Sequence, residues 1–401
     1  MEIVYLGVVF LAIVLLLGLK RPLYQAIAGG LVAIVILYAI PPVEWVSRPW
    51  KVLSHWDSLS VLLSLYLITY LQRMLEARAL LKLMQRDLNG LFHNRRVNAA
   101  GVPVFIGLLP SAAAMILCGE IVRDAAGDYL KPKEQAFVAS WFRHIPESTL
   151  PTYSSVLLMS NLSGIPLPPF MLGMIVPLIA LVALGYFPYL RRLPKDPGTP
   201  RSDNRGRDAL NLLIHLWPLI LVLILILAFK LPVVIAVLAS IAATAVIYRF
   251  RGAELVSALR SAFELKLLGN TFLVLVLKEF IAYTGVLQML PEALSTLPIP
   301  TFLIFALLFF VGTIISGSSS IIALGTPLAF AAIPGGGMPF MVLLMCVCHA
   351  ASLLSPTHVC LVVAADYFGI TLGELIRKTL PASLMFAALM IGYYLLLRLA
   401  F

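Results

Sequence analysis

Charged side chains are scarce in this chain of 401 residues. Only 12% of the residues are charged, whereas 61% are hydrophobic, and the mean hydropathy is +0.99. A soluble protein of this size has too little interior to bury so much apolar surface. The scarcity of charge therefore excludes a soluble fold and predicts an all-α membrane protein that crosses the bilayer many times.

Cysteine is also rare, and its pattern excludes two kinds of site. Cys118, Cys346, Cys348 and Cys360 all lie in apolar stretches, without the CxxC or Cys/His spacing of a metal site. We therefore expect no disulfide framework, no metal site and no cofactor.

The histidines and the basic residues exclude further classes. None of the six histidines belongs to an HExxH sequence, which an intramembrane metalloprotease needs. The net charge of +10 lies in short gaps between apolar runs rather than on one solvated face, so nucleic acid is not a predicted partner. An enzyme is not predicted, although an aspartic or serine intramembrane protease and a passive channel remain open as alternatives.

Ten apolar runs approach the roughly 20 residues that one helical crossing needs. They cover residues 3–19, 23–40, 58–75, 135–160, 167–190, 210–229, 231–247, 268–290, 338–368 and 380–399. The first resembles the apolar core of a signal peptide, but Lys20 and Arg21 follow it and no small-residue cleavage site comes after them. We interpret it as a retained helix.

Two more apolar stretches, 102–122 and 301–333, do not fit a simple crossing. The second is too long for one straight span and too short for two spans with a turn. Its centre, Ser316-Gly317-Ser318-Ser319-Ser320, is rich in turn-forming residues. We predict that both stretches are re-entrant hairpins, and irregular backbone at that depth marks a site.

The basic residues also predict the orientation of the chain. With ten crossings and two non-crossing hairpins, most of the 29 Lys and Arg residues fall on one side of the membrane. The positive-inside rule makes that side cytoplasmic. The sequence thus predicts a protein of the cytoplasmic (inner) membrane of a prokaryote, with the lipid bilayer as a partner and both termini extracytoplasmic.

A polar segment at 191–208 divides the chain into two similar halves. It is rich in Pro, Gly and charge, and we predict a cytoplasmic linker between repeat 1 (1–190) and repeat 2 (209–401). Each half has three scaffold spans, a hairpin, a broken span and a last span. Because five crossings is an odd number, the two repeats must be inverted relative to each other, which is typical of secondary transporters.

Each repeat also carries a proline break. At a fixed offset of 205 residues, Pro151 pairs with Pro356, and each lies inside a predicted span. A helical proline frees the carbonyl four residues earlier, here that of Glu147 and of Ser352. Free carbonyls suit a small cation, and the free N–H groups of the next half-helix suit an anion.

This layout resembles the ion transporter superfamily of elevator-type secondary carriers, which includes gluconate permeases, C4-dicarboxylate carriers and divalent-anion symporters. The matching motifs are Ser111, the Ser316 to Ser320 cluster and the breaks at Pro151 and Pro356. The resemblance implies a homodimer in which hairpins and broken spans slide against a fixed scaffold. Sodium-coupled dicarboxylate members carry Ser-Asn-Thr at each hairpin tip, whereas this chain has Ser-Ala-Ala and Ser-Gly-Ser, and so resembles a different branch.

We therefore predict a secondary active transporter of a small organic anion, coupled to Na⁺ or H⁺. The candidate binding residues flank the hairpin tips and the breaks: Ser111, Arg143, His144, Glu147, Ser148, Thr149, Thr152, Ser316, Gly317, Ser318, Ser319, Ser320, Ser352, Ser355, Thr357 and His358.

Several alternatives stay open for these residues. The serines could instead bond their own helices, and His144 could be a packed residue rather than a proton carrier. Arg143 could pair with Glu147, one turn away, rather than with a substrate. The rival function is a cation/proton antiporter of the same architecture, which needs a titratable carboxylate such as Glu147.

Overall fold

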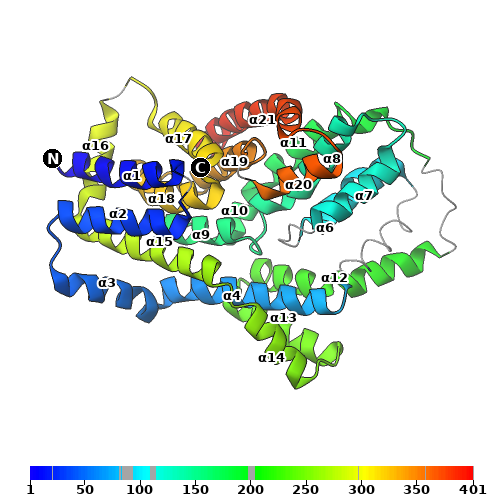
Figure 1. The fold of residues 1–401 in the computed structure, drawn as a ribbon, viewed down its shortest axis with the longest axis horizontal. Coiled ribbons are helices and arrows are strands. Elements are labelled where there is room, and N and C mark those ends of the chain that lie inside the picture. The colour runs from blue at the N-terminus through cyan, green and yellow to red at the C-terminus, as the bar shows by residue number, and fades with distance from the viewer. Residues whose placement is uncertain are drawn as a thin grey trace.

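The structure is a computed structural model that describes residues 1–19, 21–80, 83, 94–108, 114–196, 204–296, 298–356 and 358–400. Those ranges are helical apart from turns and short connections, and they contain no strand (Figure 1). The candidate residues Ser111 and Thr357 lie outside the described residues.

The first half of the chain carries its helices in the following order. They are α1 (Glu2–Gly18), α2 (Leu23–Leu37), α3 (Pro42–Ser54), α4 (Trp56–Ala77), α6 (Arg95–Ile106), α7 (Ala114–Ala126), α8 (Pro132–His144), the 3-10 helix η1 (Ile145–Ser148), α9 (Ser154–Ser163), α10 (Leu167–Gly173), α11 (Ile175–Tyr186) and the 3-10 helix η2 (Leu190–Arg192).

The second half repeats this order from α12 onward. Its helices are α12 (Arg205–Leu227), α13 (Val233–Ile247), α14 (Gly252–Ser261), α15 (Leu265–Thr284), the 3-10 helix η3 (Val286–Met289), α16 (Leu290–Ser295), α17 (Thr301–Ser316), α18 (Ser318–Ala332), α19 (Gly337–Ser352), α20 (Val359–Tyr367) and α21 (Leu372–Ala400).

Helix ends repeat in detail as well. Both α2 and α13 have 15 residues and follow a proline, and a tyrosine comes directly after each of them. Both α9 and α20 lead into a glycine of positive φ, Gly164 (72°) and Gly369 (64°). The same local chain reversals therefore follow equivalent helices in the two halves.

The helices pack into two groups. The scaffold layer consists of α1 to α4 and α12 to α15, and the hairpin layer consists of α6 to α11 and α17 to α21. In Figure 1 most of the scaffold layer lies below, with α14 lowest, and α19, α20 and α21 lie above it. The halves exchange partners: α2 packs on α15 while α13 packs on α4, and α18 packs on α9 while α7 packs on α20.

Four helical segments of the described chain are long and apolar enough to cross a membrane. They are Trp56–Ala77, Leu167–Tyr186, Gly206–Leu227 and Leu372–Leu399. Shorter apolar helices of 10–17 residues include α1, α2, α13, α17, α18 and α19. The chain is thus an all-α membrane protein.

Several observed bounds differ from the predicted runs. The run at 268–290 is not one straight span, because α15 ends at Thr284 and the chain bends by 68° after Gly285 (φ 72°). The first hairpin extends beyond 102–122, since Asn94 caps α6 by accepting hydrogen bonds from the amides of residues 96 and 97. The last span begins at Leu372 rather than at residue 380.

Two helices, α3 and α14, were not expected. Both mix charged and apolar residues, so neither contains an apolar run of crossing length. Each is joined to the long helix of the other half by an ion pair: Lys51 to Glu279 of α15 at 2.8 Å, and Glu254 to Arg78 after α4 at 2.9 Å. Through these ion pairs, α3 and α14 each link the two halves of the scaffold layer.

Candidate functional site

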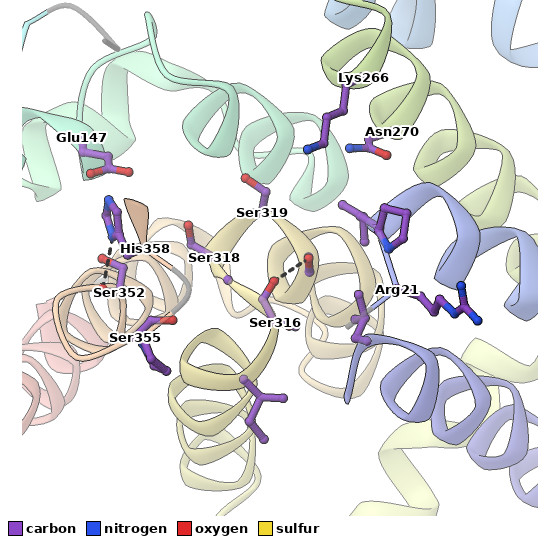
Figure 2. Close-up of a pocket in the computed structure, with 17 residues that line it drawn as sticks. Arg21, Glu147, Lys266, Asn270, Ser316, Ser318, Ser319, Ser352, Ser355 and His358 are labelled. Atoms are coloured by element: carbon purple, nitrogen blue, oxygen red, sulfur yellow. Dashed lines mark hydrogen bonds between the residues drawn. The ribbon is translucent and has the colours of Figure 1, made fainter. Parts of the chain in front are cut away.

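A cavity of about 920 Å³ lies where the α17–α18 turn meets the two helix breaks and the scaffold layer. Scaffold residues on its wall are Leu17, Arg21, Pro22, Leu23, Lys266 and Asn270; the turn contributes Ile315 to Ser320, and the breaks contribute Glu147, Ser352, Ser355, Pro356 and His358. Figure 2 shows Ser318 and Ser319 between Glu147 and His358 on one side and Lys266 and Asn270 on the other.

The α17–α18 turn depends on one glycine. Gly317 has φ 84° and ψ 156°, a conformation that is open essentially to glycine alone. The reversal lets α18 begin directly at Ser318, so its first N–H groups and the positive end of its dipole face the cavity. This arrangement suits an anion.

The serines of the turn divide into two pairs. The hydroxyl of Ser316 donates to the Gly312 carbonyl at 2.8 Å, and that of Ser320 donates to the Ser316 carbonyl at 2.8 Å. Ser318 and Ser319 have no hydrogen-bond partner among the described residues, and both line the cavity. The helix-bonding alternative therefore describes Ser316 and Ser320, whereas Ser318 and Ser319 have hydroxyls available to a ligand.

The first break places charge at the edge of the cavity. After α8 ends at His144, the Glu147 carboxylate lines the cavity and lies 3.8 Å from His144 Nε2. His144 is fully buried, and its Nδ1 meets the Ser140 carbonyl. Arg143 is buried behind them and interacts electrostatically with Glu147. Arg143 and His144 are therefore not on the cavity wall.

The second break supplies hydroxyls and an imidazole. Ser352 ends α19, and its hydroxyl donates to the His349 carbonyl at 2.8 Å. Ser355 donates to the Ile314 carbonyl of α17 at 2.9 Å, which joins the break to the hairpin. His358 Nδ1 lies 3.1 Å from the Ser352 carbonyl, and its ring lines the cavity.

Three further predicted binding residues do not reach the cavity. Thr149 is buried, and its hydroxyl has no hydrogen-bond partner within the described ranges. Thr152 lies 3.5 Å from the Leu108 carbonyl, on the side of α6. Ser148 lines a small separate gap beside His349. Packing of the chain beyond the break turns these side chains away, which the position of Pro151 alone does not show.

Residues 5–397 match the family described as "Protein of unknown function (DUF401)". The chain belongs to this DUF401 family. No curated protein matches it. Among solved structures, the DUF401 chain is similar to the Alcanivorax borkumensis YdaH transporter, with a TM-score of 0.62 and 14% identity over 88% of this chain and 87% of that one. This DUF401 protein therefore has a transporter-like fold, and the topology of the YdaH transporter is described as unusual.

Sequence reasoning missed three polar cavity residues of the DUF401 chain. Arg21 precedes α2, and Lys266 and Asn270 lie in α15. In the sequence, Arg21 and Lys266 count only as basic flanks of apolar runs. Their place on the cavity wall depends on how the scaffold layer packs against the hairpin layer, and a single sequence carries no local signal of that contact.

The fold also gathers possible metal ligands that the cysteine spacing does not indicate. One ligand atom from each of His144, His358 and Cys360 lies within 4.8 Å of the others. The spacing rule could not find this group, because His144 belongs to the first break and the other two residues to the second.

Proposed function

We propose that this DUF401 protein is a secondary active transporter of a small organic anion, coupled to Na⁺ or H⁺. The observation that carries the proposal is the cavity of about 920 Å³, in which a helix N-terminus and unpartnered hydroxyls face cationic scaffold side chains. Its size is within the range of small-molecule sites.

Charge in the cavity favours an anion over a neutral ligand. Arg21 and Lys266 contribute two positive charges, and the start of α18 adds the positive end of its dipole. Glu147 contributes one negative charge at the opposite wall. An anion held near Ser318 and Ser319 would gain from the first three groups and would lie apart from the carboxylate.

The lining also supports an elevator mechanism. Arg21, Lys266 and Asn270 belong to the scaffold layer, whereas Ser318 and His358 belong to the hairpin layer. A ligand between the layers would be exposed first to one side and then to the other when the hairpin layer slides.

The proposal includes the inverted repeats, the ten crossings with two re-entrant hairpins, the homodimer and the inner-membrane orientation with both termini outside. The exchanged helix partners of the two halves support the inverted repeats.

A second candidate function is a cation/proton antiporter of the same architecture. Glu147 favours it, because this carboxylate lines the cavity and its Oε2 has no hydrogen-bond partner among the described residues. Glu147→Gln separates the two functions. Loss of pH-driven sodium exchange in the variant, with no anion uptake by either protein in proteoliposomes, would favour the antiporter.

Thermal shift of the purified protein tests anion binding directly. Succinate, gluconate and phosphate are each added with and without sodium, and we expect at least one to raise the melting temperature. The rise should shrink in Lys266→Ala but persist in Arg260→Ala, which removes a cation from the exposed face of α14. An equal rise in both variants, or none of the anions acting on the unmodified chain, would refute the assigned site.

A further inference from the structure

We propose that the chain binds one transition-metal ion of the zinc class between the two helix breaks. The ligands are one nitrogen each of His144 and His358, the Cys360 thiolate and, as the fourth, the Glu147 carboxylate. The atoms of the first three lie within 4.8 Å of one another, and Glu147 Oε2 is 3.8 Å from His144 Nε2. This inference goes beyond the proposed transport function and does not depend on it.

Each of the two imidazole rings is oriented by a hydrogen bond to a backbone carbonyl, as the rings of metal-binding histidines usually are. Nδ1 of His144 meets the Ser140 carbonyl, and Nδ1 of His358 meets the Ser352 carbonyl at 3.1 Å. A backbone carbonyl accepts only from an N–H, so in each neutral ring the proton lies on Nδ1 and the lone pair on Nε2. Metal-binding histidines show this same outer hydrogen bond, which orients the ring.

Buried polar atoms without partners face the same point. His144 Nε2 and Glu147 Oε2 have no hydrogen-bond partner in the part of the chain that the structure describes. His144 is 0% exposed. Leaving such atoms buried and unpaired is unfavourable. A metal ion between them removes this cost for both atoms.

The distance between His144 and Glu147 suits a tetrahedral ion. Zinc bonds to nitrogen and oxygen are about 2.0–2.2 Å long, so two such ligands of a tetrahedral ion lie about 3.4 Å apart. The 3.8 Å between His144 Nε2 and Glu147 Oε2 is close to this value. The rings of His144 and His358 meet edge to face with centroids 4.7 Å apart, which lets both point nitrogens at one ion.

Charge balance also favours a divalent ion. Binding requires the Cys360 thiol to lose its proton to water, after which a thiolate and a carboxylate neutralise two positive charges. Arg143 interacts electrostatically with Cys360 and Glu147. Soft thiolate and imidazole ligands select zinc-like ions over magnesium or sodium.

The ion would join the two repeats. His144 ends α8 in the first half, whereas His358 and Cys360 lie at the start of α20 in the second. Glu147 and His358 also line the cavity, which gives an ion a path to the site. A bound ion would therefore fasten the two breaks to each other.

Cobalt titration of the purified full-length protein tests the site, because a Co²⁺–thiolate bond gives a charge-transfer absorption band. We expect one equivalent to bind and the band to appear. Cys360→Ser should abolish the band, whereas Cys346→Ser, a buried cysteine that contacts Met174, should retain it. Loss of His358 in His358→Ala should weaken affinity by more than about tenfold. A band that persists in Cys360→Ser, or no saturable binding, would overturn the proposal.

X-ray absorption on the unmodified protein loaded with zinc avoids the risk that a variant misfolds. We expect one sulfur neighbour at about 2.3 Å and nitrogen or oxygen neighbours at about 2.0–2.2 Å. A first shell of oxygen and nitrogen alone would overturn the assignment of Cys360, whatever the transport assays show.

Discussion

The two helix breaks share a backbone design but differ in chemistry. In each, a helix ends shortly after a buried histidine, His144 or His349, and a proline seven residues later precedes the next helix. The first break then places the Glu147 carboxylate at the cavity, whereas the equivalent position in the second break is Ser352. The two breaks therefore lie at corresponding places in the two halves, and only the first carries a carboxylate.

The two histidines show the same difference. His144 is hydrogen-bonded to the Ser140 carbonyl, and its ring lies edge to face with that of His358 in the other half. His349 packs its ring against Phe386 instead, with centroids 6.0 Å apart. His144 and His349, which correspond at the offset of 205 residues, therefore differ in role: the first belongs to a polar cluster, and the second packs against an aromatic ring.

The largest effect that we expect concerns the hairpin tips, where the halves also differ. The second tip turns at Gly317, whereas residues 109–113 of the first half contain no glycine. Gly317→Ala should destabilise the protein by about 1–3 kcal/mol, because alanine strongly disfavours φ 84° with ψ 156°. A Cβ there would meet no atom within 4 Å, so the loss measures backbone strain alone. The free energy of unfolding in detergent measures it.

Gly373→Ala is the matched control for the hairpin tip. Gly373 lies within α21, and a Cβ there would also meet nothing within 4 Å. A helical glycine costs about 0.5–1 kcal/mol relative to alanine, so this variant should be slightly more stable. Equal changes in the two variants would show that the tip does not need its glycine.

The next effect separates the paired histidines. His144→Leu removes the bond to the Ser140 carbonyl and should destabilise by about 1–2 kcal/mol. Nε2 is buried without a hydrogen-bond partner in both histidines, but among the described residues only the His144 ring has a hydrogen bond to lose, so His349→Leu should change stability less. Melting temperatures of the two variants provide the measurement. A larger loss in His349→Leu would reverse our assignment of the polar role.

A third effect concerns the helices that lead into the breaks. Glu134 in the first turn of α8 accepts hydrogen bonds from Arg192 at 3.0 and 3.3 Å, whereas α19 begins with Gly-Met-Pro and has no such anchor among the described residues. Burial acts to raise the pKa of Glu134, but the bonds from Arg192 and the Lys131 amide outweigh it, and the pKa is lowered.

Arg192→Ala should therefore destabilise by about 1 kcal/mol, a modest value because the Arg192 side chain is 44% exposed. Thermal unfolding at pH 7 measures the loss. Arg191→Ala, which removes the neighbouring exposed cation, is the control and should have no measurable effect. Equal melting temperatures for Arg192→Ala and the unmodified protein would show that the anchor contributes nothing.

These comparisons also show which features the sequence could predict. The breaks and the second turn were predictable, because Pro356 and Gly317 act through local backbone geometry. Helices α3 and α14 were not expected, since their mixed composition falls below the threshold of an apolar run. Arg21 and Lys266 reach the cavity only through packing between layers, and Thr152 is turned away by packing after the break. Contacts between distant segments have no local signature in one sequence.

The smallest effect concerns the ion pairs that brace the scaffold layer, whose polarity is reversed between the halves. Lys51 of α3 meets a carboxylate of α15, whereas Glu254 of α14 meets Arg78. Hydrogen bonds from Arg78, and then from the Arg251 amide, lower the pKa of Glu254 to about 2. Because the folded pKa is below the ordinary value of 4.5, the stabilisation is fully present above that value and is lost as the pH falls towards 2.

Glu254→Gln should therefore lower the melting temperature slightly and by a constant amount from pH 8 to about 5.5, and this difference should shrink below the ordinary glutamate pKa of 4.5. The effect is small because the Glu254 side chain is 39% exposed, so water screens the pair. Asp128→Asn removes an exposed carboxylate that forms no ion pair among the described residues, and it should show no such pH dependence. A difference that already shrinks between pH 8 and 6 would contradict the lowered pKa of Glu254.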